Sequence, residues 1–479
     1  MSDQNGLDGT DAGSPRPSEP RNFPPPPLAN ADAAAATVGV DTATVDAVAG
    51  QSGRKGRIFA WGLWDWGSAS FNAVATTFVF TVYLTSTKAF GGDTFVSAQL
   101  AWALGIAGVA VALVAPITGQ RSDTGGRRKL WLAVNTYLVV IALGLMFFVR
   151  PQQEFLLFAL ILLAAGTVVF EFASVNYNAM LAQVSTPRSI GKVSGFGWGM
   201  GYIGGIVLLL IVYFGFINPK VGLFGVTGDD GLDVRVSMLT AAIWFGIFAL
   251  PVLLAVPEIR PRAGLKAARV NVFRSYAVLG RDIARLWKTS RHTVYFLIAS
   301  AIFRDGLTGV FTFGGVLAAG TFGFSPGQVI IFAIAANVVA GIATIGVGAL
   351  DDRLGPKPVI ITALIGLVVC GALVFVFHDG GQIVFWTFGL ALCLFVGPAQ
   401  SASRSFLARL IPAGREGEVF GLYATTGKAA TALAPFAFGI FVSIGGAQYW
   451  GIIGIVLVLA IGLALLIPVK AKQNQLASR

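Results

Sequence analysis

The 479-residue sequence has few charged residues, since Asp, Glu, Lys and Arg together make up only 12% of it. A soluble domain usually carries about 25% charge, so a soluble protein of this length would lack the charges that cover its surface. Hydrophobic residues make up 55% of the sequence, and the mean hydropathy is +0.75. The composition therefore excludes an ordinary soluble enzyme and predicts a protein with many membrane-spanning segments.

Cysteine and histidine are also scarce, with two residues of each. Cys370 and Cys393 lie in apolar runs, so no disulfide framework is predicted. His292 and His378 are far apart in the sequence, and no His, Cys and carboxylate cluster has the spacing of a metal site. We therefore expect no cofactor, no metal and no enzymatic centre.

Long apolar runs separated by short polar breaks fill the sequence from Ile58 onward. A helix that crosses a bilayer needs about 20 apolar residues, and the lack of water in lipid forces such runs to be helical. The prediction is an all-α polytopic membrane protein with 12 transmembrane helices, in runs near 58–86, 98–119, 130–149, 155–180, 194–216, 236–256, 293–320, 328–350, 358–377, 382–405, 418–443 and 448–468.

The net charge of +11 is distributed unevenly between the connections. With a cytoplasmic N-terminus, the even-numbered connections and both tails hold 28 of the 34 Lys and Arg residues, and the other connections hold four. This bias predicts that both termini are cytoplasmic. It also explains the basic composition without a nucleic-acid partner.

The longest basic connection divides the chain into two sets of six helices. It carries nine Lys and Arg residues. The segment before the first apolar run is rich in Ala, Gly, Asp, Ser and Pro, which is typical of a disordered tail; a partner-binding polyproline stretch is the alternative. The predicted divisions are a cytoplasmic tail (1–57), a first bundle (58–256), a basic cytoplasmic linker (257–292), a second bundle (293–468) and a C-terminal cytoplasmic tail (469–479).

The two halves contain matching motifs, which indicates a duplicated six-helix unit. The pattern G-x-x-x-D-x-x-G-x-[RK] occurs twice, after the second and the eighth run, at an offset of 229 residues. A second pair of matching segments, at 180–195 and 406–421, has an offset of 226. The residues that form the two loop motifs are Gly119, Asp123, Gly126, Arg127 and Arg128 in the first half and Gly348, Asp352, Arg353 and Gly355 in the second.

This layout and its loop motif resemble the major facilitator superfamily, and within it the vacuole-effluxer-like branch related to autophagy vacuolar amino-acid effluxers. The residues that carry the branch resemblance lie at Trp61–Trp66, at Arg304–Gly306, and from Ser403 through Phe420 to Lys428. The resemblance covers residues 58–468. The chain departs from the pattern at Ser68 and Arg121, where the relatives usually have Asn and Leu.

The resemblance implies a function for the two loop motifs at the cytoplasmic face. In the family, Asp123 faces the start of the eleventh helix, and Asp352 and Arg353 face the fifth. A carboxylate near a helix N-terminus is stabilised by the free N–H groups and the dipole, by roughly 0.3–2 kcal/mol. We expect the motifs to form a latch that closes the inner gate and breaks when the halves rock; the alternative is a basic loop with a tight turn.

Ionisable residues inside spanning helices are costly and usually face a cavity. The resemblance implies that the first, fourth, seventh and tenth helices line that cavity. The predicted substrate and proton cavity comprises Asp65, Asn72, Glu171, Asn178, Arg304, Asp305, Gln400, Arg404 and Lys428. The alternative is a set of ion pairs, such as Asp305 with Lys428, that only hold helices together. Arg304 and Asp305 are adjacent, so they are predicted to turn toward different neighbours.

The predicted function is secondary active transport by alternating access, without direct use of ATP. The resemblance implies a small solute, with efflux of amino acids or similar metabolites as the leading hypothesis. Coupling to protons is a hypothesis that depends on Asp65, Glu171 and Asp305. We expect a monomer in the plasma membrane. The alternative is a non-transporting receptor or assembly partner, or a lipid-handling protein, on the same fold.

Overall fold

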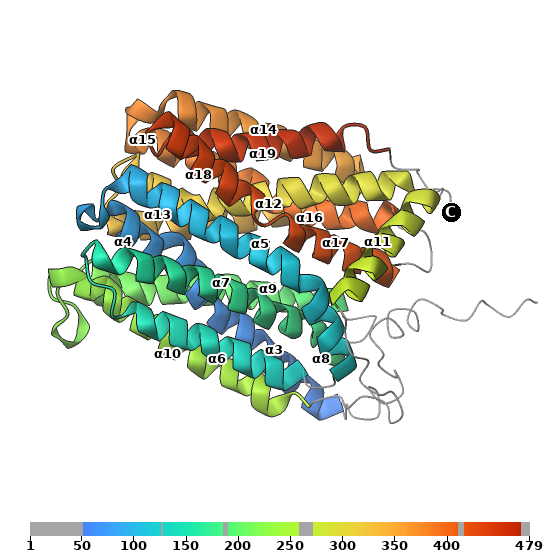
Figure 1. The fold of residues 1–479 in the computed structure, drawn as a ribbon, viewed down its shortest axis with the longest axis horizontal. Coiled ribbons are helices and arrows are strands. Elements are labelled where there is room, and N and C mark those ends of the chain that lie inside the picture. Colours follow the sequence, from blue (N-terminus) through green and yellow to red (C-terminus); the bar gives the residue numbers. More distant parts are fainter. Residues whose placement is uncertain (1–50, 126–127, 185–189, 258–271, 411–415, 471–479) are drawn as a thin grey trace, which may run out of the picture.

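A computed structural model describes residues 51–125, 128–184, 190–257, 272–410 and 416–470. Most of these residues are helical, and no strand occurs among them. Figure 1 shows that most of the long helices run side by side. The described residues are therefore all-α, as the apolar runs predict.

The first half of the chain forms the helices that the apolar runs between 58 and 256 predict. They are α3 (Gln51–Ala69), η1 (Ser70–Phe78), α4 (Phe80–Ser86), α5 (Asp93–Gly125), α6 (Arg128–Met146), α7 (Glu154–Ala179), α8 (Leu181–Val184), α9 (Ile190–Val212), η3 (Tyr213–Ile217) and α10 (Leu232–Ala255), with short 3₁₀ turns at η2 (Lys88–Phe90), η4 (Leu223–Gly225) and η5 (Asp229–Gly231).

The second half begins with a helix of the basic linker and continues with the predicted runs. Its helices are α11 (Val272–Thr289), α12 (Arg291–Gly320), α13 (Pro326–Leu354), α14 (Pro356–Val376), η6 (His378–Gly380), α15 (Gln382–Val384), η7 (Phe385–Gly389), α16 (Leu390–Leu410), α17 (Glu416–Ala429), α18 (Leu433–Gly445) and α19 (Trp450–Leu466).

Ten helical segments of the described chain are long and apolar enough to cross a membrane. The two other predicted runs have different forms. The run near 58–86 is divided into α3, η1 and α4, and the last run is the 17-residue helix α19. Apolar side chains on the outside of the helices are well exposed, such as Leu157 at 68% and Leu254 at 79%. Such a surface suits lipid rather than water.

The two halves form two groups of helices that lie against each other (Figure 1). In the first half α3 packs against α9 and α10, and α7 packs against α5 and α6. In the second half α19 packs against α12, α14 and α18. Between the halves, α5 contacts α17 and α18, α9 contacts α13, and η1 and α4 contact α12. These contacts enclose the residues that form the site.

The helix α16 continues through Gly397 and Pro398 as one element. A Cβ at Gly397 would meet the carbonyl oxygen of Ala340 in α13 at 2.9 Å, so Gly397 permits close packing of these helices. The tenth run is irregular earlier, at the π-helical segment η7.

Candidate functional site

A cavity of about 330 Å³ lies between the two halves, and we call it the central cavity. Residues of α3, η1 and α9 line it from the first half, and residues of α12, α13 and α16 line it from the second. Three of the predicted site residues, Asp65, Asn72 and Gln400, are among the lining residues. The other polar lining residues are Ser68, Thr76, Thr77, Tyr202, Thr308, Thr312 and Asn337.

A second chamber of about 150 Å³ adjoins the central cavity, and we call it the side chamber. The two cavities share four lining residues, Asn72, Thr76, Thr308 and Thr312. Glu171 and Asp305, both predicted site residues, line only the side chamber. The three intramembrane acids of the prediction therefore line two adjoining spaces between the halves.

The π-helical segment η1 shapes the wall that the two cavities share. Val79 donates its backbone N–H to the carbonyl oxygen of Val74, five residues earlier, at 3.1 Å. The hydroxyls of Thr76 and Thr77 both donate to the carbonyl oxygen of Asn72, at 2.8 and 2.7 Å. Such bonds compete with the regular helix ladder, and π-helical bulges often occur at functional sites. The irregular turn presents Asn72 and Thr76 to both cavities.

The eleventh run is broken beside the side chamber, between α17 and α18. Pro435 in the first turn of α18 has no N–H, and its ring would clash with the carbonyl of Thr431 in a continuous helix. The carboxylate of Asp305 on α12 accepts a hydrogen bond from the N–H of Ala434 at 2.5 Å. Asp305 therefore caps the new N-terminus of α18, where a negative charge is favoured.

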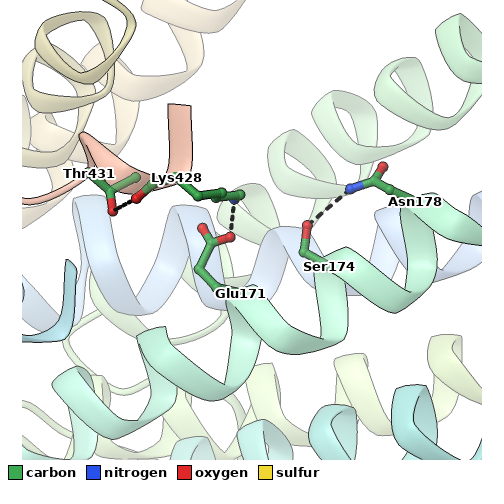
Figure 2. Close-up of polar contacts among 5 residues, drawn as sticks. All are labelled: Glu171, Ser174, Asn178, Lys428 and Thr431. Atoms are coloured by element: carbon green, nitrogen blue, oxygen red, sulfur yellow. Dashed lines mark hydrogen bonds and ion pairs between the residues drawn. The ribbon is translucent and has the colours of Figure 1, made fainter. Parts of the chain in front are cut away.

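An ion pair between Lys428 of α17 and Glu171 of α7 connects the two halves (Figure 2). The side chains are 31% and 22% exposed, respectively. Ser174 and Asn178 follow Glu171 on the next turns of α7, where the Asn178 amide donates to the Ser174 hydroxyl at 3.3 Å. Asn178 is exposed and does not line either cavity. The alternative pairing of Lys428 with Asp305 is not formed.

The carboxylate of Asp65 has its hydrogen-bond partner within the first half. Its carboxylate accepts a hydrogen bond from the phenol of Tyr177 at 3.0 Å. Trp61 and Trp64 stack on the Tyr177 ring, with centroids 4.5 and 4.2 Å away, and both are 2% exposed. The two tryptophans pack in the core of the first half and hold Tyr177 against Asp65.

Arg304 and Asp305 turn toward different partners, as predicted. The Arg304 guanidinium donates to the carbonyl oxygen of Tyr423 at 3.2 Å and lies 4.1 Å from the centroid of that ring. Tyr423 in turn shares a hydrogen bond of 2.5 Å with the Ser403 hydroxyl. Arg404 is exposed on α16 and is near enough to Arg304 to act on it electrostatically. Neither arginine lines the two cavities.

The predicted cytoplasmic gate is described only in part. Gly126 and Arg127 lie outside the described residues, and the surroundings of Gly119, Asp123, Gly348, Asp352 and Arg353 are not described either. Arg128 is buried at the start of α6, and Gly355 precedes α14 with φ of 85°. The helices that the latch requires do pack together, since α5 contacts α17 and α13 contacts α9. The latch itself stays a prediction.

The halves also meet where α5 begins and α18 ends, at the end opposite α11 (Figure 1). The buried amide of Gln448 donates to the Ser97 hydroxyl at 2.8 Å and accepts from the Thr321 hydroxyl at 2.9 Å. We call this contact the Gln448 clamp. Nearby, a Cβ at Gly315 of α12 would clash with the carbonyl oxygen of Thr77. These contacts close the molecule at this end.

Phe78, at the end of η1, lines the central cavity and also a third cavity of about 330 Å³. Sequence reasoning missed Phe78, Tyr177, Gln448 and Pro435. Pro435 had a signal, because a proline inside an apolar run often marks a break. The other three are ordinary residues in apolar or loop segments, and only packing reveals their contacts.

Comparison with known proteins defines the class. A family model described as Major Facilitator Superfamily matches residues 14–209. The fold is similar to the xylose transporter XylE from E. coli in a partially occluded inward open conformation, with a TM-score of 0.62 at 13% identity over 87% of this chain and 98% of that one. It is also similar to the nucleoside transporter NupG (TM-score 0.60, 14% identity, 86% and 98% coverage). The protein is a multi-pass membrane transporter of this superfamily.

A second family model identifies the family to which the chain belongs within this fold. A model described as "Vacuole effluxer Atg22 like" matches residues 182–477, so the chain belongs to this family. An uncharacterized MFS-type transporter, YxiO, from Bacillus subtilis is 25% identical over 85% of this chain and 93% of its own length. Autophagy-related protein 22 from Cryptococcus neoformans is 25% identical over 59% of this chain. The match spans about half, 53%, of that fungal relative's length.

Proposed function

We propose that this protein is a secondary active transporter that moves a small polar solute through the central cavity by alternating access. The observation that carries the proposal is a polar cavity between two helix groups, with Asp65 at its wall, an adjoining chamber lined by Glu171 and Asp305, and an ion pair across the groups. Charged groups in spanning helices are expensive and are retained where they contact a solute or ion path. In transporters built from repeats, such sites lie at the interface of the repeats.

The leading solute class is amino acids and similar metabolites, exported from the cell. The family description refers to a vacuole effluxer, and the side chamber has Glu171 at its wall, paired with Lys428 of the other half. The α-ammonium group of an amino acid can pair with Glu171, and its α-carboxylate can pair with Lys428. A bound zwitterion would then form two ion pairs in place of the one between these side chains. The remaining polar wall, with Asn72, Gln400 and Asn337, supplies hydrogen bonds for a side chain.

Of the three acids, Glu171 is the one whose protonation would most directly couple transport to protons. Asp65 and Asp305 have partners within their own halves, whereas the partner of Glu171 lies on the other half. A proton on Glu171 would weaken its attraction for Lys428 and so loosen the connection between halves. We place the protein in the plasma membrane as a monomer with twelve spans, cytoplasmic termini and the predicted cytoplasmic latch.

The test is transport in vesicles that contain the purified full-length chain. Metabolite profiling of cells with and without the gene selects candidate solutes, and counterflow of the labelled solute measures exchange without a driving gradient. We expect counterflow in vesicles with the protein and none in empty vesicles. An absence of counterflow for every profiled metabolite, with a folded protein, would favour a receptor or lipid-handling role. Indifference to a pH gradient would reject proton coupling alone.

A further inference from the structure

The linker helix α11 carries a row of basic side chains on one side. Arg281, Arg285 and Lys288 are spaced by four and three residues, which places them on one face of a helix. Arg291, on the first turn of α12, continues the row. All four side chains are exposed, and we call the row the basic stripe. The named side chains of this stripe all carry a positive charge.

The opposite face of α11 is fixed to the protein. Leu286 is fully buried and the half-buried Ile283 packs against the hydrophobic core. The helix contacts α12 of the second half and α5 of the first. Figure 1 shows α11 lying obliquely across the end of the molecule, at an angle to the long helices. It therefore connects the two halves while it presents the basic stripe outward.

Aromatic side chains next to the basic stripe place it at a membrane boundary. Trp287 is 37% exposed, and its ring lies 5.3 Å from the ring of Tyr295 on α12. The guanidinium of Arg291 lies 5.9 Å from the Trp287 ring. Ile298, about one turn after Tyr295, is 45% exposed on a spanning helix, where lipid is its solvent. Trp and Tyr favour the headgroup level of a bilayer, with basic side chains reaching the phosphates.

We propose that the basic stripe binds the phosphate groups of anionic phospholipids in the adjoining leaflet. The charge is complementary, and guanidinium groups form paired hydrogen bonds with phosphate oxygens. Since α11 contacts a helix of each half, bound lipid holds α5 and α12 together at this end. The negative charge of this leaflet then stabilises the conformation in which α11 contacts both α5 and α12. This inference does not depend on which solute the central cavity carries.

The experiment compares anionic and neutral lipid on the full-length protein. Phosphatidylglycerol or phosphatidylcholine is added to detergent-purified protein, and lipid retention by native mass spectrometry and the thermal unfolding midpoint are recorded. The test variant is Arg285→Gln/Lys288→Gln/Arg291→Gln. The matched control is Lys88→Gln/Arg150→Gln/Lys220→Gln, which removes three exposed basic residues outside the basic stripe. An Arg285→Gln/Lys288→Gln variant leaves the contact of Arg291 with Trp287 intact.

We expect wild type and control to retain phosphatidylglycerol preferentially and to gain thermal stability from it. Each basic group near an anionic surface contributes about a fivefold preference, so the triple variant loses at least roughly tenfold, and the double variant less. An undiminished preference in the triple variant overturns the proposal, as does an equal loss in the control. Stabilisation by inorganic phosphate to the same extent also overturns it, because the site would then bind free anions.

Discussion

The two halves of the molecule are connected by two contacts of different chemistry. At one end the Gln448 clamp is a neutral amide between hydroxyls, supported by close packing at Gly315. Beside the side chamber the connection is the ion pair of Glu171 and Lys428. A neutral amide does not titrate in the physiological range, whereas a carboxylate paired with an ammonium responds to protons and to charged solutes. The first contact is suited to closure, and the second to coupling.

The largest effect is expected from breaking the ion pair with Glu171→Gln. Removing one partner of a buried pair costs roughly 3–5 kcal/mol, and partial exposure reduces this to about 2 kcal/mol. We expect transport driven by a pH gradient to fall about thirtyfold. The variant has no carboxylate at position 171 that could take up a proton and release Lys428. Initial rates in vesicles with and without the gradient measure this.

The control for the ion pair is the exchanged variant Glu171→Lys/Lys428→Glu, which restores a pair of opposite charges. It should recover thermal stability lost in either single variant. Undiminished gradient-driven uptake in Glu171→Gln would contradict the assignment of coupling to this pair, and the contrast between the two connections would disappear.

A slightly smaller effect is expected from Gly315→Ala at the closed end. The added Cβ meets backbone at Thr77 and ring atoms of Phe78 at 3.2 Å, and the backbone cannot turn aside as a flexible side chain does. We expect at least about a tenfold loss of transport, with the closed end held open. Distances between spin labels on the two halves report the opening. Gly314→Ala is the control, because nothing lies within 4 Å of its Cβ position.

Removing the clamp with Gln448→Ala should act in the same direction but more weakly. It deletes the hydrogen bond to Ser97 that joins the halves, which contributes about 1 kcal/mol, so the equilibrium between open and closed forms shifts about fivefold. The same spin-label distances measure the shift. Gln382→Ala serves as the control, since Gln382 bonds only within the second half, to Gly323 and Gln328. Equal shifts in both variants would show that Gln448 has no specific role in closing this end.

The smallest effect is expected from Tyr177→Phe, within the first half. The change deletes the phenol that donates to Asp65 and keeps the ring that stacks with Trp61 and Trp64. We expect a loss of about 1 kcal/mol in unfolding free energy and less than about a threefold change in transport. Thermal unfolding and counterflow measure the two quantities. A transport loss as large as that of Glu171→Gln would show that Asp65, too, couples the halves.

Much of the architecture was predictable because lipid leaves few choices for the backbone. Apolar runs of sufficient length must be helical, and ten of the predicted runs meet that criterion in the structure. The adjacent Arg304 and Asp305 were correctly predicted to diverge, because a helix turns by about 100° per residue. The close contact of α16 with α13 at Gly397 is seen only in the structure.

The partners of the intramembrane charges were not predictable. From the sequence, Asp305 was the candidate partner for Lys428 in the alternative with structural ion pairs. Both residues lie in the second half. The break before α18 gives Asp305 a backbone N–H instead, and Lys428 reaches Glu171, 257 residues away in the sequence. Such a choice depends on how two helix groups dock, which no local pattern encodes.

The sequence by itself determined that this protein is a membrane-embedded helical bundle and that a few acids and bases lie within its spans, and it predicted a duplicated unit. These properties follow from composition, run length and repeated motifs, because transfer into lipid selects them residue by residue. Only the tertiary structure decided which charges meet, where the halves touch and which spaces stay open between them. Those outcomes depend on contacts between residues distant in the chain, where geometry selects one partner among several of similar chemistry.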